Sequence, residues 1–447
     1  MTDATASTPA APASGRRQSI SLFRQDAHTK RRNAAETRFK AYGLTAVLVG
    51  LFFLIVLFGS IISNGLPAFT RTVVELELTL TQEQYEEAES KLLKTGAYRD
   101  FFIAAFDREL EERGVEVEYD AAALERILGK IGGNLREFYT ANEDRLGQPV
   151  DFELSTSSRI DGYFNGRLKR EDVRDSRFLM STDLDLADEL YAAGIMKSDF
   201  NWNFITGADS GVDNPGGAGI GASVVGSFFM MIVVLVLSLP IGVAASIYLE
   251  EFAPKNRWTD LIEVNISNLA AVPSIVFGIL GLAVFIQFAG LPQSAPLVGG
   301  LVLTLMTLPT IIISTRASLK SVPPSIRDAA LGVGASKMQA VFHHVLPLAM
   351  PGILTGTIIG LAQALGETAP LLLIGMVGFV ARGYPDGFVS GFTEANSAMP
   401  AQIYTWAARA DASFYEKAWG GIIILLLFLM TMNIIAIVLR RRFERRW

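Results

Sequence analysis

Cysteine is absent from the 447 residues of this sequence, and histidine occurs only three times, as His28, His343 and His344. A chain without cysteine has no disulfide, no thiolate metal site and no cysteine nucleophile. One histidine lies in a polar segment and the other two are adjacent, which is not the spacing of a histidine metal site. The composition therefore excludes thiol chemistry and predicts that this chain binds no metal.

A P-loop is also lacking. A Walker A motif requires Gly-Lys followed by Ser or Thr, whereas Gly129-Lys130 is followed by Ile131. The chain is therefore expected not to bind ATP in that way and to carry no cofactor of its own. A motor that drives it would lie in another subunit.

Apolar residues are abundant instead. Half of the sequence is hydrophobic and the mean hydropathy is +0.34, which is typical of a membrane protein with a soluble portion. Several apolar runs reach or approach the ~20 residues that a membrane-spanning helix needs. These six runs are residues 41–66, 223–249, 266–289, 297–314, 349–380 and 420–439.

Lysine and arginine are unevenly distributed around these runs. Residues 1–40 are small, polar and basic, which indicates a disordered tail, and five arginines lie between Arg440 and Arg446. Because cytoplasmic segments are enriched in Lys and Arg, both termini are expected in the cytoplasm and residues 67–200 in the periplasm. A cleaved signal peptide is disfavoured, since the first apolar run exceeds the ~7–15 residues of such a peptide.

Residues 67–200 differ in character from the rest, because they are rich in charge and contain no spanning run. Residues 73–80 alternate as a strand does, and Thr81 to Gln84 predict a capping box that opens a helix. Helical spacing at 101–113 and 121–139, with extended segments at 150–154 and 160–164, predicts a small α+β domain. Residues 201–447 would then form the transmembrane domain.

The segment 320–347 is expected to be a cytoplasmic helical hairpin. Ser325 and Asp328 predict an approximate capping box, and Gly334 allows a turn between two short helices. A second helix is predicted at 335–345, ended by Pro347. Pattern alone leaves two interpretations open, an ordinary loop between spans or an element that inserts into a groove of another protein.

The residues of this segment resemble a motif of a known family. Asp328-Ala329-Ala330, Gly334 and Leu346-Pro347 follow the spacing E-A-A-x3-G-x9-I-x-L-P. This pattern resembles the coupling loop of binding-protein-dependent ABC importer permeases. Two positions depart from it, since Asp328 stands for Glu and His344 for Ile. Five further strings are similar to phosphate permeases of the PstA type, namely residues 248–251, 262–266, 272–278, 365–372 and 400–404.

The resemblance covers the first span and residues 201–447, so that 67–200 look like an insertion. It implies a MetI-like permease fold of about six transmembrane helices in the bacterial inner membrane. It also implies the partners, which are a homologous phosphate permease, two ATPase subunits that use ATP and Mg, and a periplasmic phosphate-binding protein. The lipid bilayer surrounds the spans, and no nucleic acid is expected. Asp328, Ala329, Ala330, Gly334, Leu346 and Pro347 would be the ATPase-coupling residues.

Candidate substrate-pathway residues lie further along the chain. Glu367 interrupts an apolar helix, where an ionisable residue is a functional candidate, and Gln363 precedes it by four residues. Related permeases often carry Arg at the position of Gln363, so the resemblance implies that a charge partner for Glu367 comes from the other permease. The alternative is that Glu367 pairs within its own bundle and never meets substrate. The remaining candidates are Gly366, Thr368, Pro273 and Ser274, the last two at a helix break that either exposes backbone donors or is a packing kink.

Four functions are compatible with these residues. They are a phosphate ABC permease, an ABC permease for another oxyanion such as sulfate or molybdate, a proton-coupled secondary transporter that uses Glu367, and a membrane receptor or scaffold. The missing P-loop and the coupling-loop spacing favour an ABC permease over a secondary transporter. The strings within 250–278 and 365–372 favour phosphate.

Overall fold

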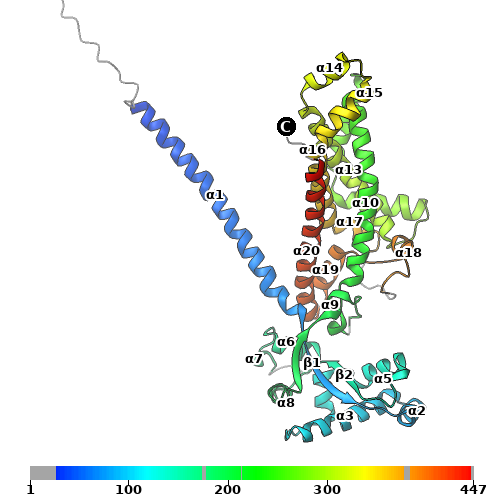
Figure 1. Ribbon diagram of the computed structural model, residues 1–447. Coiled ribbons are helices and arrows are strands. Elements are labelled where there is room, and N and C mark those ends of the chain that lie inside the picture. Colours follow the sequence, from blue (N-terminus) through cyan, green and yellow to red (C-terminus); the bar gives the residue numbers. More distant parts are fainter. Residues whose placement is uncertain (1–26, 174–177, 213, 377–382, 444–447) are drawn as a thin grey trace, which may run out of the picture. The chain divides into compact units, whose positions relative to one another are not determined.

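The computed structural model describes residues 27–173, 178–212, 214–376 and 383–443. The chain divides into two compact units, Met1–Ser60 and Ile61–Trp447, and each is described by itself (Figure 1). Most of helix α1 (Ala27–Gly65) belongs to the first unit.

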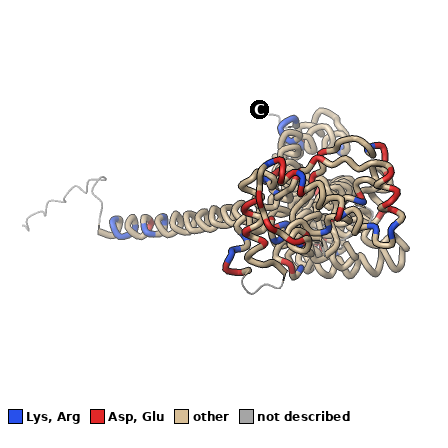
Figure 2. The backbone as a smooth tube through the Cα atoms, turned by 90° about the horizontal axis from the view of Figure 1, so that it is seen from below, with Lys and Arg blue, Asp and Glu red and all other residues tan. Residues whose placement is uncertain are grey.

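Helix α1 begins earlier than the sequence indicated. Residues 27–40 are helical and not a disordered tail, while residues 1–26 lie outside the described part of the chain. The reason is local, because this stretch contains good helix formers and neither Gly nor Pro, and Lys40 pairs with Glu36 one turn earlier at 2.6 Å. Figure 2 shows the Lys and Arg positions of α1 gathered near its start, so the apolar part follows them.

The inserted domain is α+β, as predicted. Its antiparallel sheet has the order β2-β1-β3, with Leu76 opposite Phe152 and Val74 opposite Met196. Helices pack against the sheet around a core that includes fully buried Phe102. The strands are β1 (Thr70–Leu78), β2 (Val150–Ser155) and β3 (Met196–Phe200), and the helices are α2 (Gln82–Ser90), α3 (Lys94–Glu112), α4 (Ala121–Leu128), α5 (Ile131–Ala141), α6 (Ser158–Phe164), α7 (Arg170–Val173) and α8 (Ser181–Ala192).

The structure confirms some of the local predictions for this domain and contradicts others. The capping box is confirmed, since the Gln84 amide donates to the Thr81 hydroxyl at 3.3 Å and the Thr81 amide donates to the Gln84 side chain at 3.0 Å. The helix expected at 121–139 is divided at Gly129, whose φ is +72°. The segment 160–164 is helix α6 and not extended. Strand β3 was not anticipated, because only its first residue is buried and no alternation marks it.

The rest of the second unit is a helical bundle. Five helices of the described residues, α1 included, are long and apolar enough to span a membrane, or six if α11 and α12 count as one bent span. Within the bundle α13 lies between α10 and α16, and α16 packs on α20. The elements are α9 (Trp202–Thr206), α10 (Gly221–Ile247) with its extension η4 (Tyr248–Phe252), α11 (Arg257–Leu269), α12 (Ser274–Leu280) with η5 (Gly281–Phe288), α13 (Pro296–Ser321), α14 (Pro324–Gly332), α15 (Lys337–Ala340), η6 (Val341–Val345), α16 (Leu346–Gly366), α17 (Ala369–Leu373), α18 (Ser390–Thr393), α19 (Met399–Ala408) and α20 (Ala412–Phe443).

Two predicted spans are wrong as continuous helices. The span 266–289 is split between α11 and α12, which are bent by 103°, because Pro273 disfavours helical backbone at the residue before it. The span 349–380 ends at Gly366, and residues 377–380 lie outside the described residues. Pro370 explains this end, since it has no N–H to donate to the carbonyl four residues earlier.

Candidate coupling and substrate-pathway sites

The hairpin 320–347 contains the expected turn. Gly334 has φ +89°, a conformation that favours glycine, and separates α14 from α15. The expected cap is wrong, however, because α14 begins at Pro324, a residue that suits the first turn of a helix, and Ser325 lies inside it. The second helix is capped by Ser336, whose hydroxyl accepts from the Gln339 amide at 3.2 Å.

Pro347 does not end the second helix. From Lys337 to Gly366 the chain forms a 30-residue helical stretch that runs through η6 into α16. Leu346 and Pro347 occupy the first turn of α16. The wider π turn of η6 precedes Pro347, and it accommodates a residue that cannot donate a backbone hydrogen bond.

Three of the six predicted coupling residues lie on the surface of the hairpin. Asp328, Ala329 and Gly334 are exposed, whereas Ala330 packs inward. Apolar side chains that are exposed beside them include Val333, at 87%, and Met338, at 57%. Leu346 and Pro347 are half-buried. The hairpin therefore presents an apolar outer face that no described residue of this chain covers.

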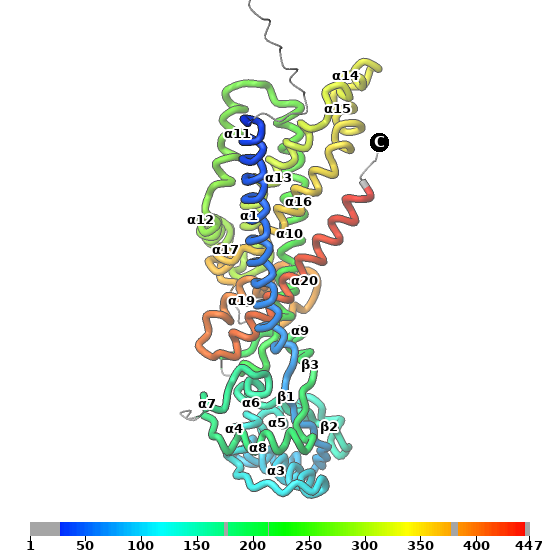
Figure 3. Tube along the Cα trace, turned by 90° about the vertical axis from the view of Figure 1, so that its left-hand side faces the viewer, coloured from blue at the N-terminus to red at the C-terminus, as the bar shows by residue number. Residues whose placement is uncertain are grey.

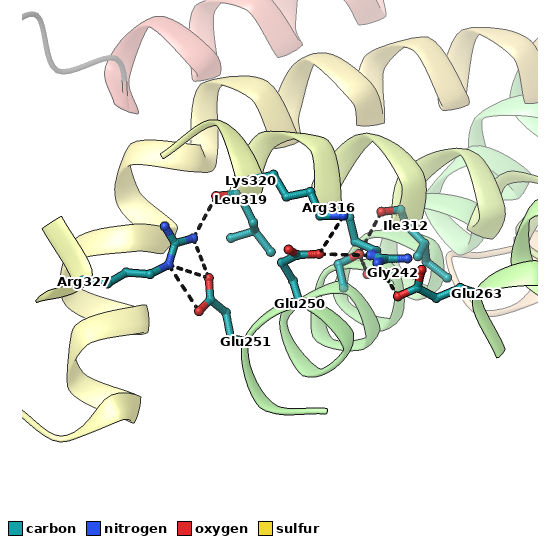
Figure 4. Close-up of polar contacts among 10 residues, drawn as sticks. Gly242, Glu250, Glu251, Glu263, Ile312, Arg316, Leu319, Lys320 and Arg327 are labelled. Carbon is teal, nitrogen blue, oxygen red and sulfur yellow. Dashed lines mark hydrogen bonds and ion pairs between the residues drawn. The ribbon is translucent and has the colours of Figure 1, made fainter. Parts of the chain in front are cut away.

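Arg327 anchors this hairpin to the bundle (Figure 4). Its Nη2 donates to Glu251 Oε1 at 2.7 Å and its Nε donates to the same oxygen at 3.1 Å. Its guanidinium also donates to the carbonyls of Val322 at 2.8 Å and Leu319 at 2.9 Å, at the C-terminal end of α13. The Arg327 side chain thus joins α14, η4 and the end of α13. Its partner is buried, since the Glu251 side chain is only 8% exposed.

A second ionic cluster lies one turn deeper along α13. Arg316 donates to Glu263 of α11 at 2.5 Å and to Glu250 of η4 at 3.3 Å. Lys320 lies 3.5 Å from the same Glu250 carboxylate. Figure 4 shows both clusters side by side along α13. Sequence reasoning missed these pairs, although the strings 248–251 and 262–266 that carry the family resemblance contain the three carboxylates.

The two predicted pathway segments belong to elements in direct contact. A Cβ atom added to Gly278 of α12 would lie 2.7 Å from the Cα atom of Pro370 in α17. Figure 3 shows α12 and α17 side by side. Pro273 and Ser274 begin α12, and Glu367 and Thr368 form the break before α17. Both helix breaks therefore lead into elements that pack together.

Glu367 is not inside a helix, as the sequence had suggested. It has extended backbone, with φ −79° and ψ 128°, at the end of α16. Glu367 and Thr368 are half-buried, and Gln363 and Gly366 are exposed. Within the described ranges, the Glu367 side chain has no ion pair or hydrogen bond, to Gln363 or to any other residue. Among the residues that the structure describes, none therefore neutralises this carboxylate.

Two family descriptions match the chain. Residues 26–173 match a domain of unknown function (DUF3333), and residues 238–447 match the binding-protein-dependent transport system inner membrane component. The first match covers most of the inserted domain, and the second covers the coupling hairpin and both helix breaks.

Individual relatives agree with the second match. The chain is 34% identical over 176 residues to the probable ABC transporter permease protein YqgI of Bacillus subtilis, which covers 39% of this chain and 58% of that protein. It is 31% identical over 215 residues to the phosphate transport system permease protein PstA 1 of Mycobacterium tuberculosis, which covers 48% of this chain and 68% of that protein. Among solved structures it is similar to the MetNI methionine ABC transporter in inward-facing conformations, at 16% identity and a TM-score of 0.37 over 51% of this chain and 94% of that chain.

Fold and matches together define a multi-pass inner-membrane permease subunit of the binding-protein-dependent ABC transporter class. Subunits of this class are not catalytic. Within the class, the chain belongs to the PstA-type family of phosphate transport system permeases, with DUF3333 as its additional N-terminal domain.

Proposed function

We propose that this chain is the transmembrane permease subunit of an ATP-driven importer of inorganic phosphate. It forms the translocation pathway with a homologous permease and is driven by two ATPase subunits that bind the ATP and Mg. The observation that carries the proposal is the coupling hairpin, which has an uncovered apolar face and is anchored at its base by the buried Glu251. A groove of a partner protein would cover that face.

The helix that follows the hairpin supports a transmission role. The stretch Lys337–Gly366 has 30 residues, which at 1.5 Å per residue is about 45 Å long. A bilayer core is about 30 Å thick, so a helix with one end in the cytoplasm reaches across most of the membrane. A push on α15 would therefore reach the break at Glu367 without a flexible joint.

The pathway itself would be shared between two permeases. A carboxylate alone repels a phosphate anion, and an unpaired charge inside a membrane protein is costly. Since Glu367 has no partner among the described residues, an Arg of the homologous permease is the partner that fits. Gln363, which supplies no cation, supports the same conclusion. The competing role for Glu367 is to accept a hydrogen bond from protonated phosphate.

The orientation follows from the same arrangement. Arg327 and Glu251 mark one end of α10 and α13, and the inserted domain contacts the first turn of α20 through Arg167 and Glu416. In Figure 1 the hairpin and the inserted domain lie at opposite ends of the bundle. If the hairpin meets an ATPase in the cytoplasm, the inserted domain is periplasmic and a periplasmic phosphate-binding protein delivers substrate on that side.

The test is reconstitution of this chain with the subunits that copurify with it. ATP-dependent uptake of phosphate into proteoliposomes, without uptake of sulfate, is the expected result. Sulfate or molybdate uptake would support an ABC permease for another oxyanion. Uptake driven by a pH gradient without ATP would overturn the proposal in favour of a proton-coupled transporter.

A matched pair of glycine variants tests the coupling step. Gly334→Asp should abolish ATP-driven uptake while the chain still inserts and assembles. Gly114→Asp is the control, because Gly114 also has positive φ, at +66°, and open space for a side chain, but lies in the inserted domain. Normal uptake by the Gly334→Asp complex would remove the coupling role.

A further inference from the structure

A buried ionic junction joins the inserted domain to the first turns of α20. Glu416 is 7% exposed and Lys417 is 5% exposed, although both are charged residue types that rarely lie inside a protein without a partner. Arg167, which follows α6, lies 3.0 Å from the Glu416 carboxylate. Lys417 precedes the predicted span 420–439.

Lys417 contacts two further segments and lines the same cavity as a third. Its Nζ lies 3.5 Å from the carbonyl oxygen of Ala68 in η1 (Leu66–Phe69), and 5.0 Å from the centroid of the Phe204 ring in α9. Asp161 of α6 lines the same cavity as Lys417, and this carboxylate accepts from the Thr72 amide of β1 at 2.8 Å. One ammonium group therefore lies where η1, α6, α9 and α20 meet.

These charged groups line one small cavity. Asp161, Arg167, Glu416 and Lys417 line a cavity of about 20 Å³ together with Thr156. Two of these groups are acidic and two are basic, and a third basic residue of the lining, Arg71, pairs with Glu153 of β2 at 2.7 Å. The buried Thr156 hydroxyl has no hydrogen-bond partner in the described part of the chain. The cavity has room for about one water molecule, which would satisfy that hydroxyl.

Close backbone packing accompanies the charges. A Cβ atom on Gly420 would lie 2.5 Å from the Cβ of Ala68 and 2.8 Å from the ring of Phe204. These are the same two residues that Lys417 contacts, one helical turn earlier. The contact between α20, η1 and α9 is therefore tight as well as ionic, which is unlike a surface along which a domain slides.

We propose that the inserted domain is fixed to α20 as one rigid body, with Lys417 and Asp161 as its positioning residues, so that the domain and α20 move together during transport. Helix α20 packs along α16, and Arg440 near its far end donates to Thr355 of α16 at 3.1 Å. Helix α16 belongs to the long helical stretch Lys337–Gly366, which begins in the coupling hairpin. The inserted domain is therefore connected to the hairpin through α20 and α16. The second half of this proposal rests on the proposed function, whereas the fixed junction does not.

Hydrogen exchange of the full chain tests the junction without transport. Lys417→Met keeps most of the side-chain volume and removes the charge, and should speed exchange at η1 and α6 at least tenfold while leaving α3 unchanged. Adding Asp161→Asn removes the opposite charge, so the double variant should be less perturbed than the sum of the two single variants. The control is Lys197→Met, because Lys197 pairs with Glu75 on the exposed face of the sheet, where the side chains are 49% and 46% exposed.

Unchanged exchange at η1 and α6 in Lys417→Met would overturn the junction. Faster exchange throughout the inserted domain would also overturn it, because the charges would then serve the fold of the domain and not its attachment. If Lys417→Met does not fold, the same comparison is made with Asp161→Asn alone.

Cross-linking tests whether the two parts move together. The chain has no cysteine of its own, so Arg167→Cys with Glu416→Cys places the only two thiols across the junction. A bifunctional thiol reagent should leave ATP-driven uptake by the reconstituted complex at the level before cross-linking. Loss of uptake that returns on cleavage of the reagent would show that the domain must separate from α20, and would overturn the rigid-body proposal. Absence of uptake in the untreated wild type would instead count against the proposed function and leave the exchange result standing.

Discussion

Glu251→Gln is the variant that tests most directly how the coupling hairpin is held. The substitution keeps the shape of the side chain and one acceptor oxygen. It replaces the other oxygen with an NH₂ group, which cannot accept from the Arg327 guanidinium. Arg327 keeps its bonds to the carbonyls of Leu319 and Val322, so α14 remains attached to α13 but loses its ionic link to η4.

The size of the effect follows from burial. Hydrogen bonds between charged groups contribute about 1.5–3 kcal/mol. The Glu251 side chain is 8% exposed, whereas the Arg327 side chain is 22% exposed and keeps some contact with solvent. The loss should therefore fall below the ~3–5 kcal/mol of a fully buried broken pair. We take about 2 kcal/mol, which is roughly a 30-fold change in the equilibrium for local opening.

Hydrogen exchange of the α14 amides measures that opening. Exchange at α14 should be roughly 30-fold faster in Glu251→Gln. The control is Asp260→Asn, an exposed carboxylate on α11, for which no change is expected. In the reconstituted complex, ATP hydrolysis should continue while phosphate uptake per ATP falls, because the hairpin transmits less of the push. An α14 that exchanges at the wild-type rate in Glu251→Gln would refute the anchoring role.

Three further predictions concern other parts of the chain. Gly278→Ala should lower the melting temperature, at a cost of about 1–3 kcal/mol, because the new Cβ would lie 2.7 Å from Pro370 Cα. Gly366→Ala is the control, since Gly366 has open space around it and its substitution should leave the melting temperature unchanged. Equal melting temperatures of the two variants would contradict the close packing of α12 on α17. Glu367→Gln should impair phosphate uptake without loss of complex assembly, and an unchanged transport rate would return Glu367 to a purely structural role. Hydrogen bonds from Arg136 and Lys94 lower the pKa of Glu89 to about 2 from its ordinary 4.5, so the stability that this carboxylate adds to the inserted domain is present above about pH 4.5 and is lost as the pH falls toward 2. Glu89→Gln should reduce this loss of stability at low pH, measured as hydrogen exchange of the α2 and α5 amides over a series of pH values. The same loss in the variant as in the wild type would contradict the stabilising role of the Glu89 carboxylate.

Features that depend on neighbouring residues were readable from the sequence. The apolar runs located most of the long helices, because a spanning helix needs an uninterrupted apolar length. The capping box at Thr81, the turn at Gly334 and the spacing from Asp328 to Pro347 are local patterns as well. The inserted α+β domain was recognisable for the same reason, since its charge and alternation contrast with the spans on both sides.

Local patterns also gave wrong predictions of where helices end near a proline. Pro370 ends α16 before Glu367, so a carboxylate expected inside a helix lies at a break. Pro347 had the opposite outcome, because the π turn of η6 accommodates it and the helix continues. In both cases the decision depended on whether the surrounding backbone could rearrange, which composition does not show.

Tertiary structure alone decided which charges meet. Glu251 and Arg327 are 76 residues apart in sequence, and Arg167 is brought to Glu416 from a different domain. Charged residues near the ends of apolar runs look alike in a sequence, whether solvent or a partner satisfies them. Whether such a group is buried and paired depends on contacts between distant segments, and these exist only once the chain has folded. The sequence by itself therefore determined that the chain is a permease with an extra domain, and the fold determined how the hairpin and that domain are fastened to it.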